Sequence, residues 1–196
     1  AASGQLIQLE PGNQSLRSIK TKYQQLMAEA QGMSSGNSPS FSSSQDIQTA
    51  KRCLHELHGV IENLQAHNQL SSRYARGYSE QVKELILQTS VEECFLLASK
   101  AKSDGHPKTE VLHYRHAIEL LNKANKNGRF DAQISQIDYK KAKIELLAVA
   151  KLAKKEYPKD KPAIREIIND NAYYLQYNLT PYQITLLHNF AGSLHP

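Results

Sequence analysis

Apolar residues recur at spacings of three and four along most of the chain, which is the pattern of amphipathic helices. The segment 14–30 carries one such stripe, and Gly32 ends it. A second segment, beginning near Ser44, repeats its apolar positions with a period of 3.5 residues over fewer than three heptads. This seam predicts a helical hairpin rather than a free coiled coil, and the helix 14–30 is a candidate partner. The seam consists of Ile47, Ala50, Leu54, Leu57, Ile61 and Leu64.

A serine-rich segment separates these two helices. Residues 32–44 contain seven serines in thirteen positions, so they form a flexible linker or a disordered loop. Ser43, followed by Asp46 three residues later, fits a capping box at the start of the next helix. We therefore expect a disordered N-terminal segment over 1–13, a helical hairpin over 14–68, and a body of stacked helices over 69–196.

The same periodicity predicts every element of the body to be helical, without a segment of strand alternation. Residues 71–102 form one helix or two, because Ser90 and Glu93 also fit a capping box. Gly105 and Pro107 mark a stop, and Thr109 is expected to cap the next helix. Further helices are expected over about 109–127, 132–157, 163–174 and 181–190, the last one capped by Thr180. The fold class is all-α, with six or seven helices.

Within this body, residues 91–124 resemble a tetratricopeptide repeat, a pair of antiparallel helices with small residues at their contact. The positions that carry the resemblance are Ala98, Gly105, Tyr114 and Ala117. Glu110 stands where a small residue is expected and Cys94 lies near the missing aromatic start, and adjoining windows do not repeat the pattern. The resemblance implies a helix–turn–helix stack and a surface that binds peptides or proteins. A generic helical hairpin is the alternative.

Charge is distributed unevenly along the chain. The formal net charge is +5, and residues 132–165 hold nine Lys or Arg against four acidic residues, which accounts for all of it. One interpretation is contact with anionic lipid headgroups, nucleic acid or an acidic partner. The other is a solvated helix face, on which lysines favour the helix C-terminus. The candidate contact residues are Lys140, Lys151, Lys154 and Lys155.

Tyrosine is concentrated near the C-terminus, in residues 171–182. These residues include Tyr173, Tyr174, Tyr177 and Tyr182. A tyrosine has an apolar body and a polar tip, so it suits either a contact surface or the packing of a short terminal helix. An exposed concave groove lined by Tyr114, Tyr173 or Tyr177 would favour peptide binding, and these three are the candidate partner-binding tyrosines.

Patterns that support catalysis or metal binding are weak. His55 and His58, with Cys53 nearby, superficially resemble a zinc-protease motif, but the second His comes one residue early. His113 and His116 also stand three residues apart, and helix-surface histidines explain both pairs. The chain has no P-loop and no nucleophile elbow. We expect no catalytic residue, cofactor or metal, and interpret the chain as a non-enzymatic protein-interaction or scaffolding domain.

The remaining composition bears on the cellular compartment. Two cysteines permit at most one disulfide, which makes a reducing, cytoplasmic location the default expectation. No run of 18 apolar residues occurs, and residues 1–14 lack the features of a signal peptide. A membrane tether in a segment that precedes this sequence is the alternative expectation.

Overall fold

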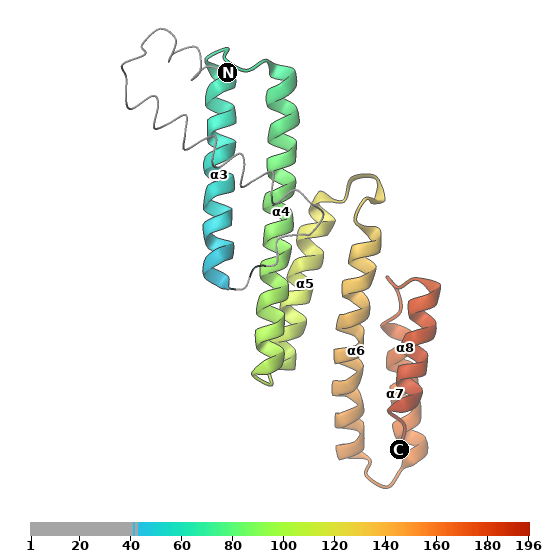
Figure 1. Ribbon diagram of the computed structural model, residues 1–196. Coiled ribbons are helices and arrows are strands. Elements are labelled where there is room, and N and C mark those ends of the chain that lie inside the picture. Colours follow the sequence, from blue (N-terminus) through green and yellow to red (C-terminus); the bar gives the residue numbers. More distant parts are fainter. Residues whose placement is uncertain (1–40, 42) are drawn as a thin grey trace. The chain divides into compact units, whose positions relative to one another are not determined.

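The computed structural model describes residue 41 and residues 43–196 (Figure 1). The expectations for 1–13, for the helix 14–30 and for most of the serine-rich segment lie outside these residues. The chain divides into two units, and the boundary follows Ser42. The described unit is entirely helical and has no strand, which confirms the all-α class. Its α-helices are α3 (Ser44–Ala66), α4 (Ser72–Ser103), α5 (Pro107–Ala124), α6 (Asp131–Glu156), α7 (Lys161–Tyr174) and α8 (Pro181–Ser193).

Helices that are neighbours in sequence are also neighbours in space. Each of α3 to α7 packs on the next helix in the chain, and α6 additionally contacts α8 (Figure 1). Within the described residues, Leu54 and Ile61 of the heptad seam pack against α4, whereas Leu57 of the same seam is 46% exposed. The expected pairing of α3 with the helix 14–30 lies outside the described residues. Helix α3 belongs to the same compact unit as the helices that follow it.

The helix ends follow local chemistry. The Ser43 hydroxyl accepts a hydrogen bond from the Asp46 backbone N–H at 3.2 Å, so it caps α3 as expected. Helix α4 ends in a Schellman motif, in which Gly105 adopts a φ of 73° and the His106 N–H donates to the Ala101 carbonyl. The expectation for Thr109 is wrong. Helix α5 starts earlier, at a proline that its first turn accommodates, and no side chain caps it.

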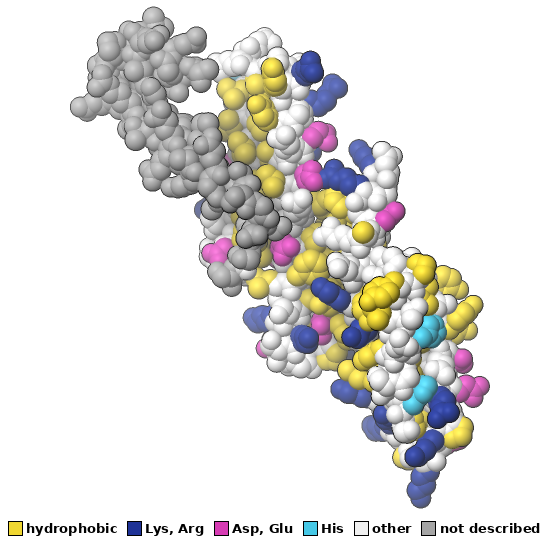
Figure 2. All heavy atoms as spheres, turned by 45° about the vertical axis from the view of Figure 1, so that its right-hand side comes forward, with side chains coloured by type: hydrophobic (Ala, Val, Ile, Leu, Met, Phe, Trp, Pro, Cys, Tyr) yellow, Lys and Arg dark blue, Asp and Glu magenta, His cyan; other side chains and the backbone are white. Residues whose placement is uncertain are grey.

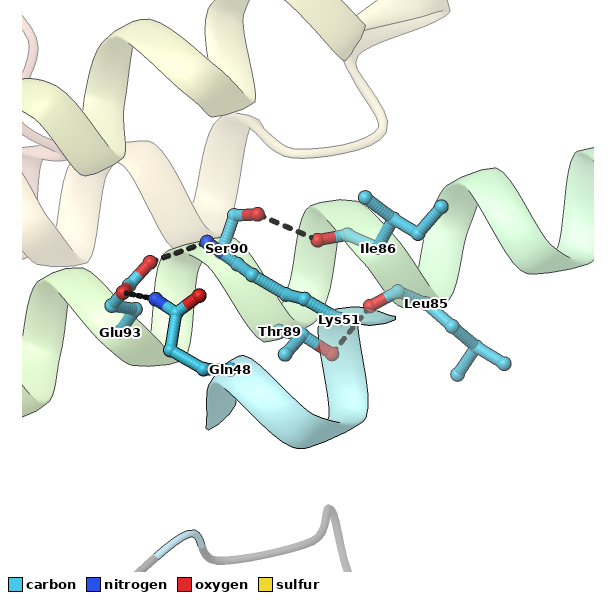
Figure 3. A network of polar contacts seen from close by, with 7 residues as sticks. All are labelled: Gln48, Lys51, Leu85, Ile86, Thr89, Ser90 and Glu93. Carbon is cyan, nitrogen blue, oxygen red and sulfur yellow. Dashed lines mark hydrogen bonds and ion pairs between the residues drawn. The ribbon is translucent and has the colours of Figure 1, made fainter. Parts of the chain in front are cut away.

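The long segment after the first turn is one helix, α4, rather than two. The Ser90 hydroxyl donates to the Ile86 carbonyl at 2.8 Å, so it satisfies a bond inside the helix instead of capping a new one. Glu93 points to α3, where it accepts a hydrogen bond from the Gln48 amide at 2.7 Å and pairs with the Lys51 ammonium (Figure 3). The apparent capping box therefore serves the contact between α3 and α4.

Small residues form much of the core. Several alanines are completely buried at the contacts between helices, which lets the helix backbones approach closely. They are Ala75, Ala98, Ala117, Ala142 and Ala172, each 0% exposed. Larger apolar residues surround them in three clusters, between α3 and α4, from α4 to α6, and from α6 to α8. The core is thus a series of local contacts between neighbouring helices.

Adjacent leucines on α6 test this packing. Leu146 is 0% exposed in the cluster of α6 to α8, whereas Leu147 is 39% exposed. We expect Leu146→Ala to lower the free energy of unfolding by about 2–5 kcal/mol, because it leaves a cavity that the neighbouring helices only partly fill. Leu147→Ala removes the same atoms from a partly solvated position and should cost much less. Urea unfolding followed by circular dichroism measures both, and equal losses would contradict the described core.

Candidate functional site

Four tyrosines lie at the connection between α7 and α8, and we call them the tyrosine surface. Tyr173 and Tyr174 end α7, Tyr177 lies in the following turn, and Tyr182 lies in the first turn of α8. Their exposed fractions are 59%, 67%, 81% and 72%, respectively. The rings of Tyr173 and Tyr174 stand edge to face with centroids 6.0 Å apart. Figure 2 shows hydrophobic side chains gathered at this end of α7 and α8.

Contacts on both sides of the connection between α7 and α8 hold the backbone beneath the tyrosine surface in place. Ala172 and Leu179 are buried against α6 to α8, which anchors the chain on either side of the turn. Thr180 and Gln183 form a complete capping box at the start of α8. The Gln183 side-chain oxygen accepts the Thr180 N–H at 2.9 Å and also accepts the Ser135 hydroxyl of α6. Gln183 therefore links the connection between α7 and α8 to α6.

The exposure of these tyrosines argues against the interpretation that they pack a terminal helix onto the body. A side chain that packs a terminal helix onto a body loses most of its accessible surface, and none of the four does so. Buried isoleucine, leucine and alanine residues of α7 and α8 provide that packing instead. Exposed aromatic rings grouped on one surface are typical of a contact site for another molecule.

Tyr114 does not belong to the tyrosine surface. It lies on α5, partly buried in the cluster of α4 to α6, and its ring is 6.2 Å from the Phe95 ring. Burial, together with the negative charge of Glu110, raises the pKa of Tyr114. Tyr173 and Tyr177 are exposed near the end of α7, whereas Tyr114, on α5, packs against the cluster of α4 to α6, so the three do not line one groove.

The basic residues of 132–165 also separate into two groups. Lys140 and Lys143 of α6 lie over aromatic rings, with the Lys140 ammonium 5.4 Å from the Phe95 centroid and that of Lys143 4.7 Å from the Phe190 centroid. The Lys141 ammonium pairs with the buried carboxylate of Asp138 at 2.5 Å. Lys141 and Lys143 are partly buried in these contacts, whereas Lys140 remains exposed. The candidate residues Lys151, Lys154 and Lys155 are exposed on the last turns of α6.

Each histidine pair combines one exposed side chain, His55 or His116, with one partly buried side chain, His58 or His113. The His58 Nδ1 atom is 3.5 Å from the Glu62 carboxylate of the same helix, and His55 is exposed. The His116 Nδ1 atom is 3.9 Å from the Glu119 carboxylate. Among the residues that the structure describes, no three His, Cys, Asp or Glu side chains form a group able to hold a metal ion.

Sequence reasoning missed a hollow of about 520 Å³ between α4 and the connection from α5 to α6. Its apolar lining is Leu87, Ala124 and Phe130. Its charged lining combines four basic residues with two acidic ones, and Arg129 pairs with Glu84 across it. No local pattern signals this hollow, because its lining comes from segments about forty residues apart.

Comparison with known proteins identifies no relative of this chain. No protein-family model, curated protein or solved structure matches this chain.

The two cysteines provide a test of burial around α4. Cys53 is exposed and Cys94 is buried, and burial raises the pKa of the Cys94 thiol, with a smaller contribution from the Glu93 charge. The reactive thiolate of Cys94 is therefore scarce at neutral pH and also shielded. In a Cys53→Ser variant, we expect iodoacetamide to alkylate Cys94 far more slowly in the folded chain than in urea. The folded rate should also keep rising at a pH where the rate in urea has levelled. Equal pH profiles would contradict the raised pKa.

Proposed function

We propose that this chain is a non-catalytic protein-interaction module and that the tyrosine surface is its contact site. The observation that carries the proposal is the exposure of four tyrosine rings, 59–81%, at one connection between helices. A tyrosine has only two side-chain torsions, so it buries a large area on binding at a low entropic cost. Tyrosine is also among the residues that dominate binding energy at protein interfaces.

The rigid support of this surface favours binding further. The Gln183 side chain joins the capping box of α8 to Ser135 of α6, and Leu179 anchors the turn in the core. A contact surface that is already ordered loses less conformational freedom when a partner binds. The resemblance of residues 91–124 to a tetratricopeptide repeat, which implies binding of peptides or proteins, stays a prediction that points in the same direction.

Site-specific photocrosslinking tests the proposal with a partner that is still unidentified. Benzoylphenylalanine replaces Tyr177 in the full chain, expressed in the cells from which the protein comes. Tyr74 of α4, which is 63% exposed, is replaced in the same way as a matched control. We expect irradiation to give a discrete protein adduct from position 177 and none from position 74, measured as a mass shift on an immunoblot.

A second variant connects the adduct to the neighbouring rings. Tyr173→Ala with Tyr182→Ala should reduce the adduct at position 177 strongly, since a central interface tyrosine contributes about 2 kcal/mol or more. The corresponding change at α4, Tyr78→Ala, should leave it unchanged. The absence of any adduct, or equal adducts at positions 177 and 74, would overturn the proposal.

A further inference from the structure

Six exposed basic side chains lie at or near the connection between α6 and α7, at the opposite end of α7 from the tyrosine surface. Figure 2 shows Lys and Arg side chains gathered at this end of the molecule. We call this group the basic end. It consists of Lys151, Lys154, Lys155, Lys159, Lys161 and Arg165. None of the six forms an ion pair with any residue in the described part of the chain, in contrast to Lys141. Their charges therefore face solvent.

Acidic residues compensate this charge only in part. Between Lys151 and Arg165, the sequence contains two acidic residues, Glu156 and Asp160, so this stretch carries a net charge of +4. The Asp160 carboxylate accepts the Ala163 backbone N–H at 3.0 Å as the cap of α7, which holds it at the helix N-terminus. The basic end is therefore a strongly positive local surface, although the net charge of the whole chain is mild.

Two large apolar side chains are exposed among these cations. Leu152 of α6 is 57% exposed, and Tyr157, which ends α6, is 43% exposed. Leu152 precedes Lys155 by three residues, so the two lie side by side on the helix surface. The combination of lysines with exposed leucine and tyrosine is typical of protein surfaces that lie at a membrane interface.

We propose that the basic end binds the surface of an anionic phospholipid membrane. The lysines attract the headgroups electrostatically, and Leu152 and Tyr157 enter the interfacial layer. Five of the six cations are lysine, whose charge acts without the fork geometry by which arginine recognises individual phosphates. A protein surface that binds nucleic acid would instead carry aromatic and arginine side chains that stack on bases. Nucleic acid would also offer no apolar layer for the exposed Leu152. No described helix has the length and apolar character needed to cross a bilayer.

Vesicle flotation with the full chain tests this surface. The probes are phosphatidylcholine vesicles with and without phosphatidylserine, at low and at physiological salt. We expect binding only with phosphatidylserine and weaker binding at higher salt. Lys154→Ala, Lys155→Ala and Lys159→Ala together should weaken binding by roughly 100-fold, from roughly fivefold for each lysine near an anionic surface.

The matched control removes three exposed lysines elsewhere, through Lys83→Ala, Lys123→Ala and Lys126→Ala. This variant has the same net charge as the first one, so it should retain binding if position matters. An equal loss of vesicle binding in both variants would mean that only the net charge matters, and it would overturn the proposal. Absence of binding to phosphatidylserine vesicles at low salt would overturn it as well, and so would tighter binding to duplex or single-stranded nucleic acid that the same three lysines control.

Fluorescence tests the apolar part of the contact, because the chain contains no tryptophan. A Tyr157→Trp variant places a single reporter at the basic end, and a Tyr177→Trp variant places one at the tyrosine surface. On addition of phosphatidylserine vesicles, we expect a blue shift at position 157 and quenching by spin-labelled lipid there, but neither at position 177. Equal responses at both positions, or no response at 157, would contradict insertion at the basic end.

Discussion

The described structure depends on one constraint: each helix buries small and apolar residues against the helices next to it in the sequence. Buried alanines such as Ala98 and Ala117 make this possible, because they let helix backbones approach closely. Polar contacts such as the ion pair of Lys51 and Glu93 help to fix the register of one helix against the next. Stability in such an arrangement is approximately a sum of local interfaces. The core therefore extends helix by helix rather than around one centre.

This mode of packing leaves the ends of the helices and their outer faces exposed to solvent. Helix α7 has 14 residues, so about 20 Å separates its two ends. One end carries the tyrosine surface and the other carries the basic end. The two surfaces differ in chemistry, since one offers aromatic rings with few charges and the other offers unpaired lysines. The two contacts that we propose therefore use different residues and different chemistry.

Much of the fold was predictable from the sequence, whereas the sites were predictable only in part. The caps at Ser43 and Thr180 and the stop at Gly105 depend on residues within one turn, so local pattern was sufficient. Ser90 and Glu93 resemble a capping box, but Ser90 bonds to the preceding turn of α4 and Glu93 contacts two side chains of α3. The tyrosines of residues 171–182 could not be assigned either, since exposure depends on which face the neighbouring helices cover.

The sequence by itself determined the helical class, the approximate bounds of the described helices and the position of the excess charge. Those properties arise from interactions between residues a few positions apart. Only the tertiary structure decided that Lys141 and Lys143 contact other side chains while Lys154 and Lys155 remain exposed, and that Tyr114 is partly buried while Tyr177 is exposed. Burial and pairing depend on residues that are distant in the chain and come together only when the helices pack.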